Sequence, residues 1–227
     1  MAFKYKFLLN NILSPAGKVS IHLGNSEMAD RLLVYFNTRK WNRGFLKLKK
    51  YNISLLPIDQ FSKEDDYLAS VNGKNSAAYF SRRCAKLGYT FQSFNPNDEI
   101  DAIFEINTSS TERQGREMDE SYKHLVTEWP NDDVNNWFGI YSKEGKLVAY
   151  VWTYVVGEMV LINRILGHGD YLKENVMYLL MTSVVSTFVN DNRINFIMYD
   201  TFGKFENGLV MFKKRIGFKP FTVNFKR

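Results

Sequence analysis

Residues 158–189 read EMVLINRILGHGDYLKENVMYLLMTSVVSTFV, and this stretch decides the fold. Its first part, residues 158–166, is apolar and rich in β-branched residues, which predicts a buried strand. The apolar run at residues 171–189 is too long for a strand and predicts the longest helix of the chain. The turn between them carries Gly167 and Gly169. A strand, a turn and a long helix in succession indicate an α/β layer fold.

Strand and helix signals continue on both sides of this stretch. Before this stretch we expect a strand at 89–94, a helix from Asn95 to about Asn107 and a second helix carrying Met118, Tyr122 and Leu125. A hairpin over 137–156 that turns at Glu144 and Gly145 then leads into the stretch. After it we expect a strand at 195–199, a helix at 206–215 and a strand at 219–226. The predicted fold class is α/β, with a mixed, mostly antiparallel central sheet flanked by helices on both faces.

The first 88 residues give weaker signals. Ser26 predicts the cap of one helix, residues 45–56 predict one or two strands, and two further helices precede Gly88. We therefore divide the chain into residues 1–88, a basic N-terminal extension or small α/β subdomain, and residues 89–227, the main domain.

The composition is that of a packed protein without a structural metal. Of the 227 residues, 45% are hydrophobic and 15% aromatic, which excludes disordered and low-complexity classes. The only cysteine, Cys84, excludes an internal disulfide, and His22, His124 and His168 lack metal-ligand spacing. No apolar run reaches the roughly 18 residues of a membrane helix and no secretory leader is recognisable, so we expect a cytoplasmic protein.

The charge is uneven along the chain. Residues 1–50 carry a net charge of +8 and residues 204–227 a net charge of +6, whereas residues 51–203 carry −8. The basic run at residues 39–50 has aromatic residues between its charges, a pattern that suits nucleic acid, an acidic carrier protein or a membrane surface. A solvated strand face explains the same run without any partner.

Two patterns within residues 89–227 resemble the GNAT (GCN5-related N-acetyltransferase) superfamily. At residues 208–220, GLVMFKKRIGFKP, an apolar helix runs into Gly217 and Phe218, as does the family's last helix before its final strand. At residues 164–169, RILGHG fits the family's pyrophosphate loop, Q/R-x-x-G-x-G/A, between the central strand and the longest helix. The resemblance implies a GNAT-like acyl-CoA N-acyltransferase fold. It extends to the Fem-type aminoacyl transferases, which share the fold but use aminoacyl-tRNA.

The resemblance implies acetyl-CoA as co-substrate. Backbone N–H groups in such a loop cradle a diphosphate, and glycines let the backbone approach it closely. A Gly-His-Gly turn without a ligand is the alternative. The residues that the resemblance assigns to the cofactor are Ile162, Arg164, Leu166, Gly167, His168, Gly169 and Asn207.

Acyl transfer to an amine needs a base for the amine, a donor for the oxyanion and an acid for the leaving group. For the base, the resemblance indicates Glu158 at the start of the central strand or Asp200 just past the next strand. For the acid it indicates Tyr199 or Tyr171. The family often has a tyrosine in its last helix that acts as the general acid; at that position this chain has Lys213. A packing role is the alternative for each candidate.

The polar loop at residues 109–116 borders the acceptor site in the resembled fold. There, Arg113, Gln114 and Arg116 are expected to bind the substrate, with the two arginines forming a clamp for a carboxylate or phosphate. The alternative is a helix-capping loop whose arginines pair with neighbouring acids.

We therefore predict an N-acyltransferase that moves acetyl from acetyl-CoA to a primary amine of a small molecule, a sugar nucleotide or a protein. A second hypothesis takes an acyl or aminoacyl group from a carrier protein or aminoacyl-tRNA, because both carriers are anionic and residues 1–50 are basic. A third is a non-catalytic binding module with the same fold, because Lys213 replaces the tyrosine and no base is unambiguous.

Overall fold

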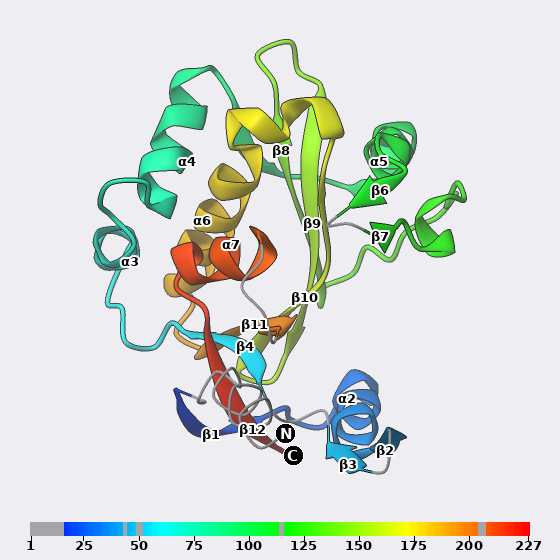
Figure 1. Cartoon of the computed structure of the whole chain (residues 1–227), viewed down its shortest axis with the longest axis vertical. Helices are drawn as coiled ribbons and strands as arrows, with labels where there is room; N and C mark the ends of the chain where they lie inside the picture. The colour runs from blue at the N-terminus through cyan, green and yellow to red at the C-terminus, as the bar shows by residue number, and fades with distance from the viewer. Residues whose placement is uncertain (1–15, 43–44, 49–51, 114–115, 204–207) are drawn as a thin grey trace, which may run out of the picture.

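An eight-stranded sheet forms the centre of the structure (Figure 1). The computed structural model describes residues 16–42, 45–48, 52–113, 116–203 and 208–227. The strands of this sheet are β1 (Gly17–His22), β4 (Ile53–Pro57), β5 (Thr90–Ser93), β8 (Asn135–Tyr141), β9 (Leu147–Val156), β10 (Met159–Gly167), β11 (Phe196–Thr201) and β12 (Lys219–Lys226). Their order is β1-β12-β4-β11-β10-β9-β8-β5. Among the described strands of this sheet, only β1 with β12 and β10 with β11 pair in parallel, so the predicted mixed, mostly antiparallel sheet is confirmed.

Helices cover both faces of the sheet, as predicted. One face carries α3 (Glu64–Ser70), α4 (Ala77–Lys86), α6 (Val176–Val189) and α7 (Gly208–Ile216), and α6 contacts the other three. The opposite face carries α2 (Glu27–Asn37) and α5 (Ile100–Thr108). Figure 1 shows the first group to the left of the strands and the second group to the right.

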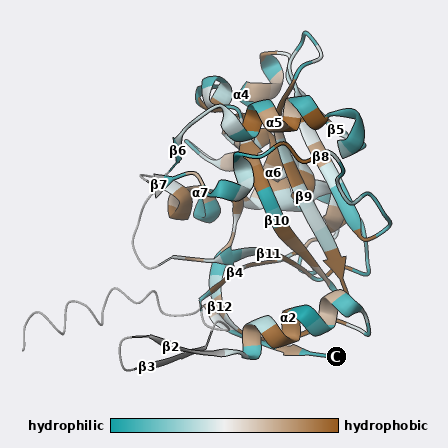
Figure 2. Cartoon of the chain, turned by 90° about the vertical axis from the view of Figure 1, so that its right-hand side faces the viewer, coloured by the Kyte–Doolittle hydropathy of each residue, from teal (hydrophilic) through white to brown (hydrophobic). Residues whose placement is uncertain are grey.

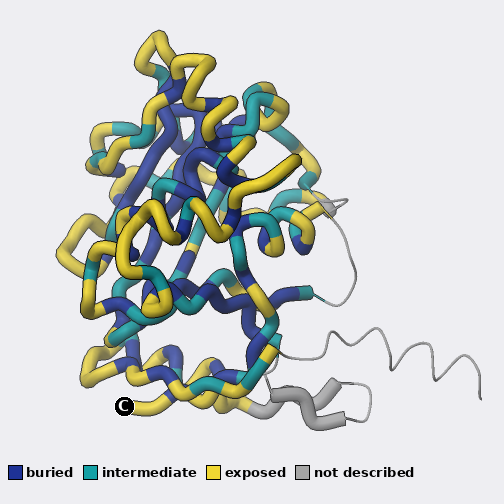
Figure 3. The backbone as a smooth tube through the Cα atoms, turned by 90° about the vertical axis from the view of Figure 1, so that its left-hand side faces the viewer, coloured by how far each residue is buried: buried dark blue, intermediate teal, exposed yellow. Residues whose placement is uncertain are grey.

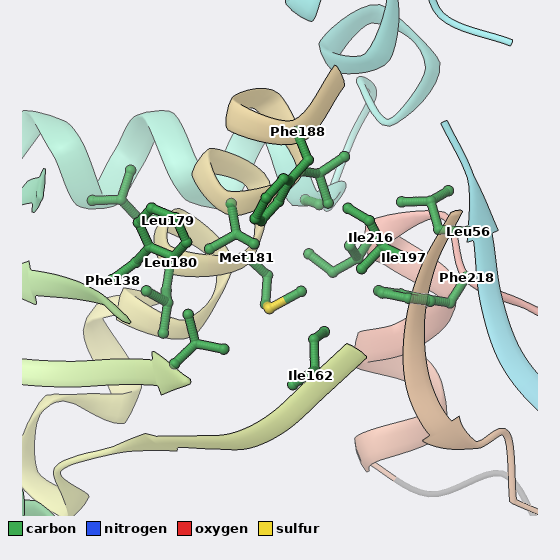
Figure 4. Packing of buried hydrophobic residues seen from close by; sticks show 14 of the residues in the cluster. Leu56, Phe138, Ile162, Leu179, Leu180, Met181, Phe188, Ile197, Ile216 and Phe218 are labelled. Atoms are coloured by element: carbon green, nitrogen blue, oxygen red, sulfur yellow. The ribbon is translucent and has the colours of Figure 1, made fainter. Parts of the chain in front are cut away.

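The helix α6 forms the centre of the largest core because its sequence is apolar on nearly every side. Leu180, Met181 and Val185 are fully buried. Figure 4 shows residues of this helix among Phe138, Ile162 and Ile197 of the sheet. Each such buried side chain contributes about 1.5–3 kcal/mol to folding. In Figure 3 the central strands are buried along most of their length, whereas the loops around them are exposed.

A β-bulge at Asn163 reverses the faces of β10. The register against β9 shifts between Ile162 and Arg164. Before the shift, Val160 and Ile162 point into the α6 core; after it, Ile165 packs against that core. Arg164 therefore lies on the α5 face, with an inserted residue accounting for the change.

Strands from the first 88 residues lie within the same sheet. The strand β1 pairs with β12, and β4 lies between β12 and β11. The hairpin of β2 (Arg39–Asn42) and β3 (Phe45–Leu48) forms a separate two-stranded sheet. Ser26 caps α2 as predicted, with its Oγ accepting a hydrogen bond from the Ala29 N–H at 3.1 Å.

Two helix predictions are wrong in detail. The expected helix around Met118 is absent from this described segment. In its place lie the hairpin β6 (Glu112–Arg113) with β7 (Arg116–Glu117) and the 3₁₀ helix η2 (Glu120–Tyr122). The apolar residues of this segment are too sparse to form a longer helical stripe. The long helix starts at Val176, because Asn175 adopts a left-handed conformation (φ 68°) that separates it from the 3₁₀ helix η3 (Gly169–Glu174).

Another short helix precedes α5: the 3₁₀ helix η1 (Pro96–Asp98), capped by Asn95, with Pro96 in its first turn as predicted. Among the described helices, none combines the length and the apolar character that crossing a membrane requires.

Candidate functional site

The two parallel strands at the centre of the sheet part soon after they meet. Pairing between β10 and β11 is limited to Met159–Leu161 against Phe196–Met198. Figure 2 shows β11 and β4 lying across the lower ends of β8, β9 and β10. Past this point β11 continues through Tyr199 to Asp200, which has a left-handed backbone (φ 47°). Beyond Leu161 and Met198 the two strands are therefore no longer paired with each other.

A buried lysine lies beside the parted strands. Lys213, on α7, is only 1% exposed, and its Nζ donates to the carbonyl oxygens of Tyr199 (2.7 Å) and Thr201 (2.8 Å). Its ammonium group also lies 4.1 Å from the centre of the Tyr199 ring. Gly217, with φ 106°, ends α7 as predicted, and the Phe218 N–H donates to the Lys213 carbonyl at 3.0 Å.

Burial makes the Lys213 side chain a weak base. It lowers the pKa of Lys213 from 10.5 to about 8, and the Asp200 carboxylate offsets part of this fall. In the sequence, Lys213 stands out only as the residue at the position where the resembled family often has a tyrosine. The available signal was its spacing, because Val210, Lys213 and Ile216 form the buried stripe of α7.

The free energy of unfolding is expected to depend on pH through Lys213. Between about pH 8 and pH 10.5 the unfolded chain holds a proton that the folded chain has released, so stability rises with pH. From about pH 7.5 to about pH 9.5, the wild type should gain about 2 kcal/mol relative to Lys213→Met. Urea unfolding of both proteins at both pH values measures this difference. The tyrosines and Cys84 are present in both proteins, so their contributions cancel in the comparison. A difference that stays constant with pH would contradict the assignment.

Tyr199 remains protonated at neutral pH. Burial raises its pKa well above the ordinary value, and the neighbouring Tyr122 and Asp200 raise it further. The Tyr199 ring packs against Phe218, with 6.0 Å between the ring centroids, at the edge of the α6 core. The structure thus brings Tyr199 and Asp200 together with Lys213.

The other candidate acid and base lie elsewhere. The Glu158 carboxylate accepts hydrogen bonds from the His22 N–H (2.7 Å) and from Asn195 Nδ2 (2.6 Å), at the turn between β9 and β10. At roughly 3.3 Å per residue, this turn is about 30 Å from Gly167 at the other end of β10. Tyr171, on η3, packs its ring against His168 (5.4 Å between centroids).

The backbone N–H groups of the predicted pyrophosphate loop already have acceptors. The His168 N–H donates to Val148 O (2.8 Å), and the Gly169 N–H donates to Ser109 Oγ (3.0 Å). The next two donate to His168 itself, the Asp170 N–H to its Nδ1 (3.3 Å) and the Tyr171 N–H to its carbonyl (3.1 Å). A diphosphate would have to replace these bonds. The cofactor role of this loop therefore stays a prediction.

Packing also explains the residues of this loop. Gly167 approaches α6 so closely that a Cβ would lie 2.6 Å from Met177 Sδ, and a Cβ on Gly169 would lie 3.1 Å from the Ser109 carbonyl. Leu166 is buried against the α5 side and Ile162 in the α6 core. His168 is buried, with Nε2 3.4 Å from the Glu105 carboxylate. Asn207 lies outside the described residues.

Arg113 joins the end of α5 to the end of β10. Its Nη1 donates to Gly167 O (2.8 Å), and its Nη2 donates to Ile106 O (3.2 Å) and Ser109 Oγ (3.1 Å). These bonds occupy both terminal nitrogens, so an acceptor would compete with the protein for them. Gln114 and the side chain of Arg116 lie outside what the structure describes. The predicted substrate clamp therefore stays a prediction.

No cluster of three or more metal-ligating side chains occurs among the residues that the structure describes.

Comparison with known proteins shows the fold and no close relative. No family model and no curated protein matches the sequence. FemX superimposes with a TM-score of 0.58 at 11% identity, over 81% of this chain and 62% of FemX. The C-terminal domain of a proposed lysylphosphatidylglycerol synthetase from Agrobacterium fabrum gives 0.52 at 14% identity, over 76% of this chain and 59% of that domain. The chain thus spans about three fifths of the length of these structures. The predicted resemblance is confirmed at the level of the fold, which this chain shares with FemX and with the Agrobacterium fabrum domain.

Proposed function

We propose that this protein transfers an acyl group to an amine at the place where β10 and β11 part. The observation that carries the proposal is the juxtaposition of Tyr199, Asp200 and Lys213 at that place. The GNAT-like fold supports it, because acyl transfer is the activity that the resemblance implies.

These three residues match the needs of the reaction. The amine nitrogen forms a bond to the acyl carbon, and the bond from that carbon to the sulfur or oxygen of the donor breaks. Asp200 takes the proton that the amine loses. Tyr199, which is protonated at neutral pH, gives its proton to the departing sulfur or oxygen. The Lys213 ammonium, close to the Tyr199 ring, stabilises negative charge that develops on the leaving side.

Acetyl-CoA is the first candidate donor, and an acyl or aminoacyl group on an anionic carrier is the second. The hydrogen bonds within the loop at residues 167–171 favour the second, because they leave the diphosphate of coenzyme A without the N–H donors it would need. The net charge of +8 on residues 1–50 also suits a carrier protein or aminoacyl-tRNA. The acceptor is a primary amine of a small molecule, a sugar nucleotide or a protein.

Thermal unfolding and a transfer assay distinguish the two donors. Binding of acetyl-CoA at 100 times its Kd should raise the free energy of unfolding by about 2.7 kcal/mol and increase Tm. If the donor is aminoacyl-tRNA, acetyl-CoA should leave Tm unchanged, and binding of charged tRNA should weaken steeply with salt. An acyl carrier protein is tested in the same way.

Transfer is followed with a mixture of primary amines, by thiol release from the thioesters and by loss of labelled amino acid from tRNA. Tight binding of one of these donors with no transfer to any amine would contradict the proposal and favour the non-catalytic binding module.

A further inference from the structure

The Asn163 bulge places a positively charged side chain on the α5 face of the sheet. Without the bulge, the regular alternation of the strand would point Arg164, like Val160 and Ile162, into the apolar α6 core. With it, the guanidinium group lies over two aromatic rings, 4.2 Å from the centre of Tyr122 and 5.3 Å from that of Trp129. Stacking of this kind orients the guanidinium plane and leaves its N–H donors at the edge.

Two buried nitrogen atoms at this place lack hydrogen-bond partners. Arg164 Nη1 is buried and forms no hydrogen bond, and the same holds for Nε1 of Trp129, a residue that is only 6% exposed. A buried donor without an acceptor destabilises the folded protein, and more so when the group is charged. Two such donors in one aromatic cluster therefore indicate that an acceptor from outside the chain belongs there.

The charges around Arg164 also favour an anion. In the described part of the chain, neither Arg164 nor the neighbouring Arg113 forms an ion pair with a carboxylate. Asp119 interacts electrostatically with Arg164, but its side chain is exposed and accepts a hydrogen bond from the Ser121 N–H at 2.9 Å. The Tyr150 hydroxyl donates to Asn107 Oδ1 at 2.6 Å and accepts a hydrogen bond from the Arg164 side chain, but it is neutral and leaves the guanidinium charge without a counter-ion.

We propose that Arg164, with Trp129, binds an oxyanion, a carboxylate or a phosphate, carried by the amine acceptor. This inference rests on the proposed function and names the acceptor class. Arg164 and Tyr122 are partly exposed, so the cluster lies near the surface. Arg164 lies on β10 just beyond Leu161, the last residue of that strand that pairs with β11, so an anion held there would bring the attached amine toward the parted strands. A guanidinium edge pairs with either oxyanion through two parallel N–H bonds.

Isothermal titration with inorganic phosphate and with acetate tests this site without any acyl donor. We expect the wild type to bind at least one of the two, and Arg164→Gln to bind it about tenfold more weakly. Arg164→Lys keeps the charge but loses the planar fork and should weaken binding about threefold. The preferred ion identifies whether the acceptor carries a phosphate or a carboxylate.

Arg193→Gln is the matched control because it removes the same charge from an exposed arginine that pairs with Asp191 at 2.7 Å. It should change the Kd less than about twofold. The proposal is overturned if neither ion binds the wild type, or if Arg193→Gln weakens binding as much as the Arg164 variants do. If Arg164→Gln fails to fold, Arg164→Lys decides. Because no donor is present, anion binding can hold while acyl transfer fails, and the two results are read separately.

Discussion

Replacing Tyr199 by phenylalanine is expected to lower kcat for acyl transfer by about 100-fold or more, because a positioned general acid contributes roughly 10²–10⁴-fold to the rate. The substitution removes one hydroxyl group and keeps the ring that faces Phe218 and the Lys213 ammonium. The packing should therefore survive, and KM should change little, since the hydroxyl acts on the leaving group in the transition state. Steady-state kinetics with the donor identified by the transfer assay measure both constants.

Two further tyrosine variants make this result specific. Tyr171→Phe tests the other tyrosine that the resemblance indicates as the acid; a large loss of kcat there, with Tyr199→Phe active, would assign proton donation to η3. Tyr79→Phe, on α4, removes a hydroxyl from an exposed residue and should leave kcat within about twofold of the wild type. Wild-type kcat in Tyr199→Phe would exclude the proposed role of this hydroxyl.

The parts of the fold that the sequence predicts well depend on local signals. The hairpin of β8 and β9 turns at Glu144 and Gly145 as expected, and Gly145 adopts φ 81° there. Gly217 ends α7 because its left-handed conformation closes the helix before β12. In both cases a residue with a strong backbone preference lies next to a clear apolar pattern.

Other features depend on partners distant in the chain. The strand β4 pairs with β11 and β12, which follow it by about 140 and 165 residues, and nothing in its five residues specifies those neighbours. The bulge at Asn163 arises from register, which the apolar pattern of residues 158–166 does not reveal. The sequence therefore predicts β10 as a strand but not the face on which Arg164 lies.

In the candidate site, too, some features follow from the local sequence and others depend on residues distant in the chain. Tyr199 and Asp200 follow from their place at the end of a predicted strand. The engagement of Arg113 with three backbone and side-chain oxygens does not follow from its sequence, because those acceptors come from α5 and from the end of β10. The burial of Lys213 could not be predicted without knowing which side of α7 faces the sheet, since a lysine in an amphipathic helix is ordinarily exposed.

Gly157→Ala is expected to lower the free energy of unfolding by about 4 kcal/mol, from backbone strain and a clash together. Gly157 lies in the turn between β9 and β10 with φ 58°, a conformation that costs alanine about 1–2 kcal/mol. A Cβ there would also meet the His22 carbonyl oxygen and lie 2.6 Å from the Leu23 carbonyl carbon. These are backbone atoms of the β1 end, so the contact cannot be relieved by a side-chain rotation.

Relief of the clash would separate this turn from the end of β1. It would weaken the bonds from the Glu158 N–H to His22 O (3.1 Å) and from the His22 N–H to the Glu158 carboxylate (2.7 Å). Gly145→Ala is the matched control, because that glycine also has a positive φ in a tight turn but no atom within 4 Å of its Cβ position. Urea unfolding should show a loss of only about 1–2 kcal/mol for the control. Equal losses in the two variants would mean that backbone conformation alone determines the cost and that β1 does not press on this turn.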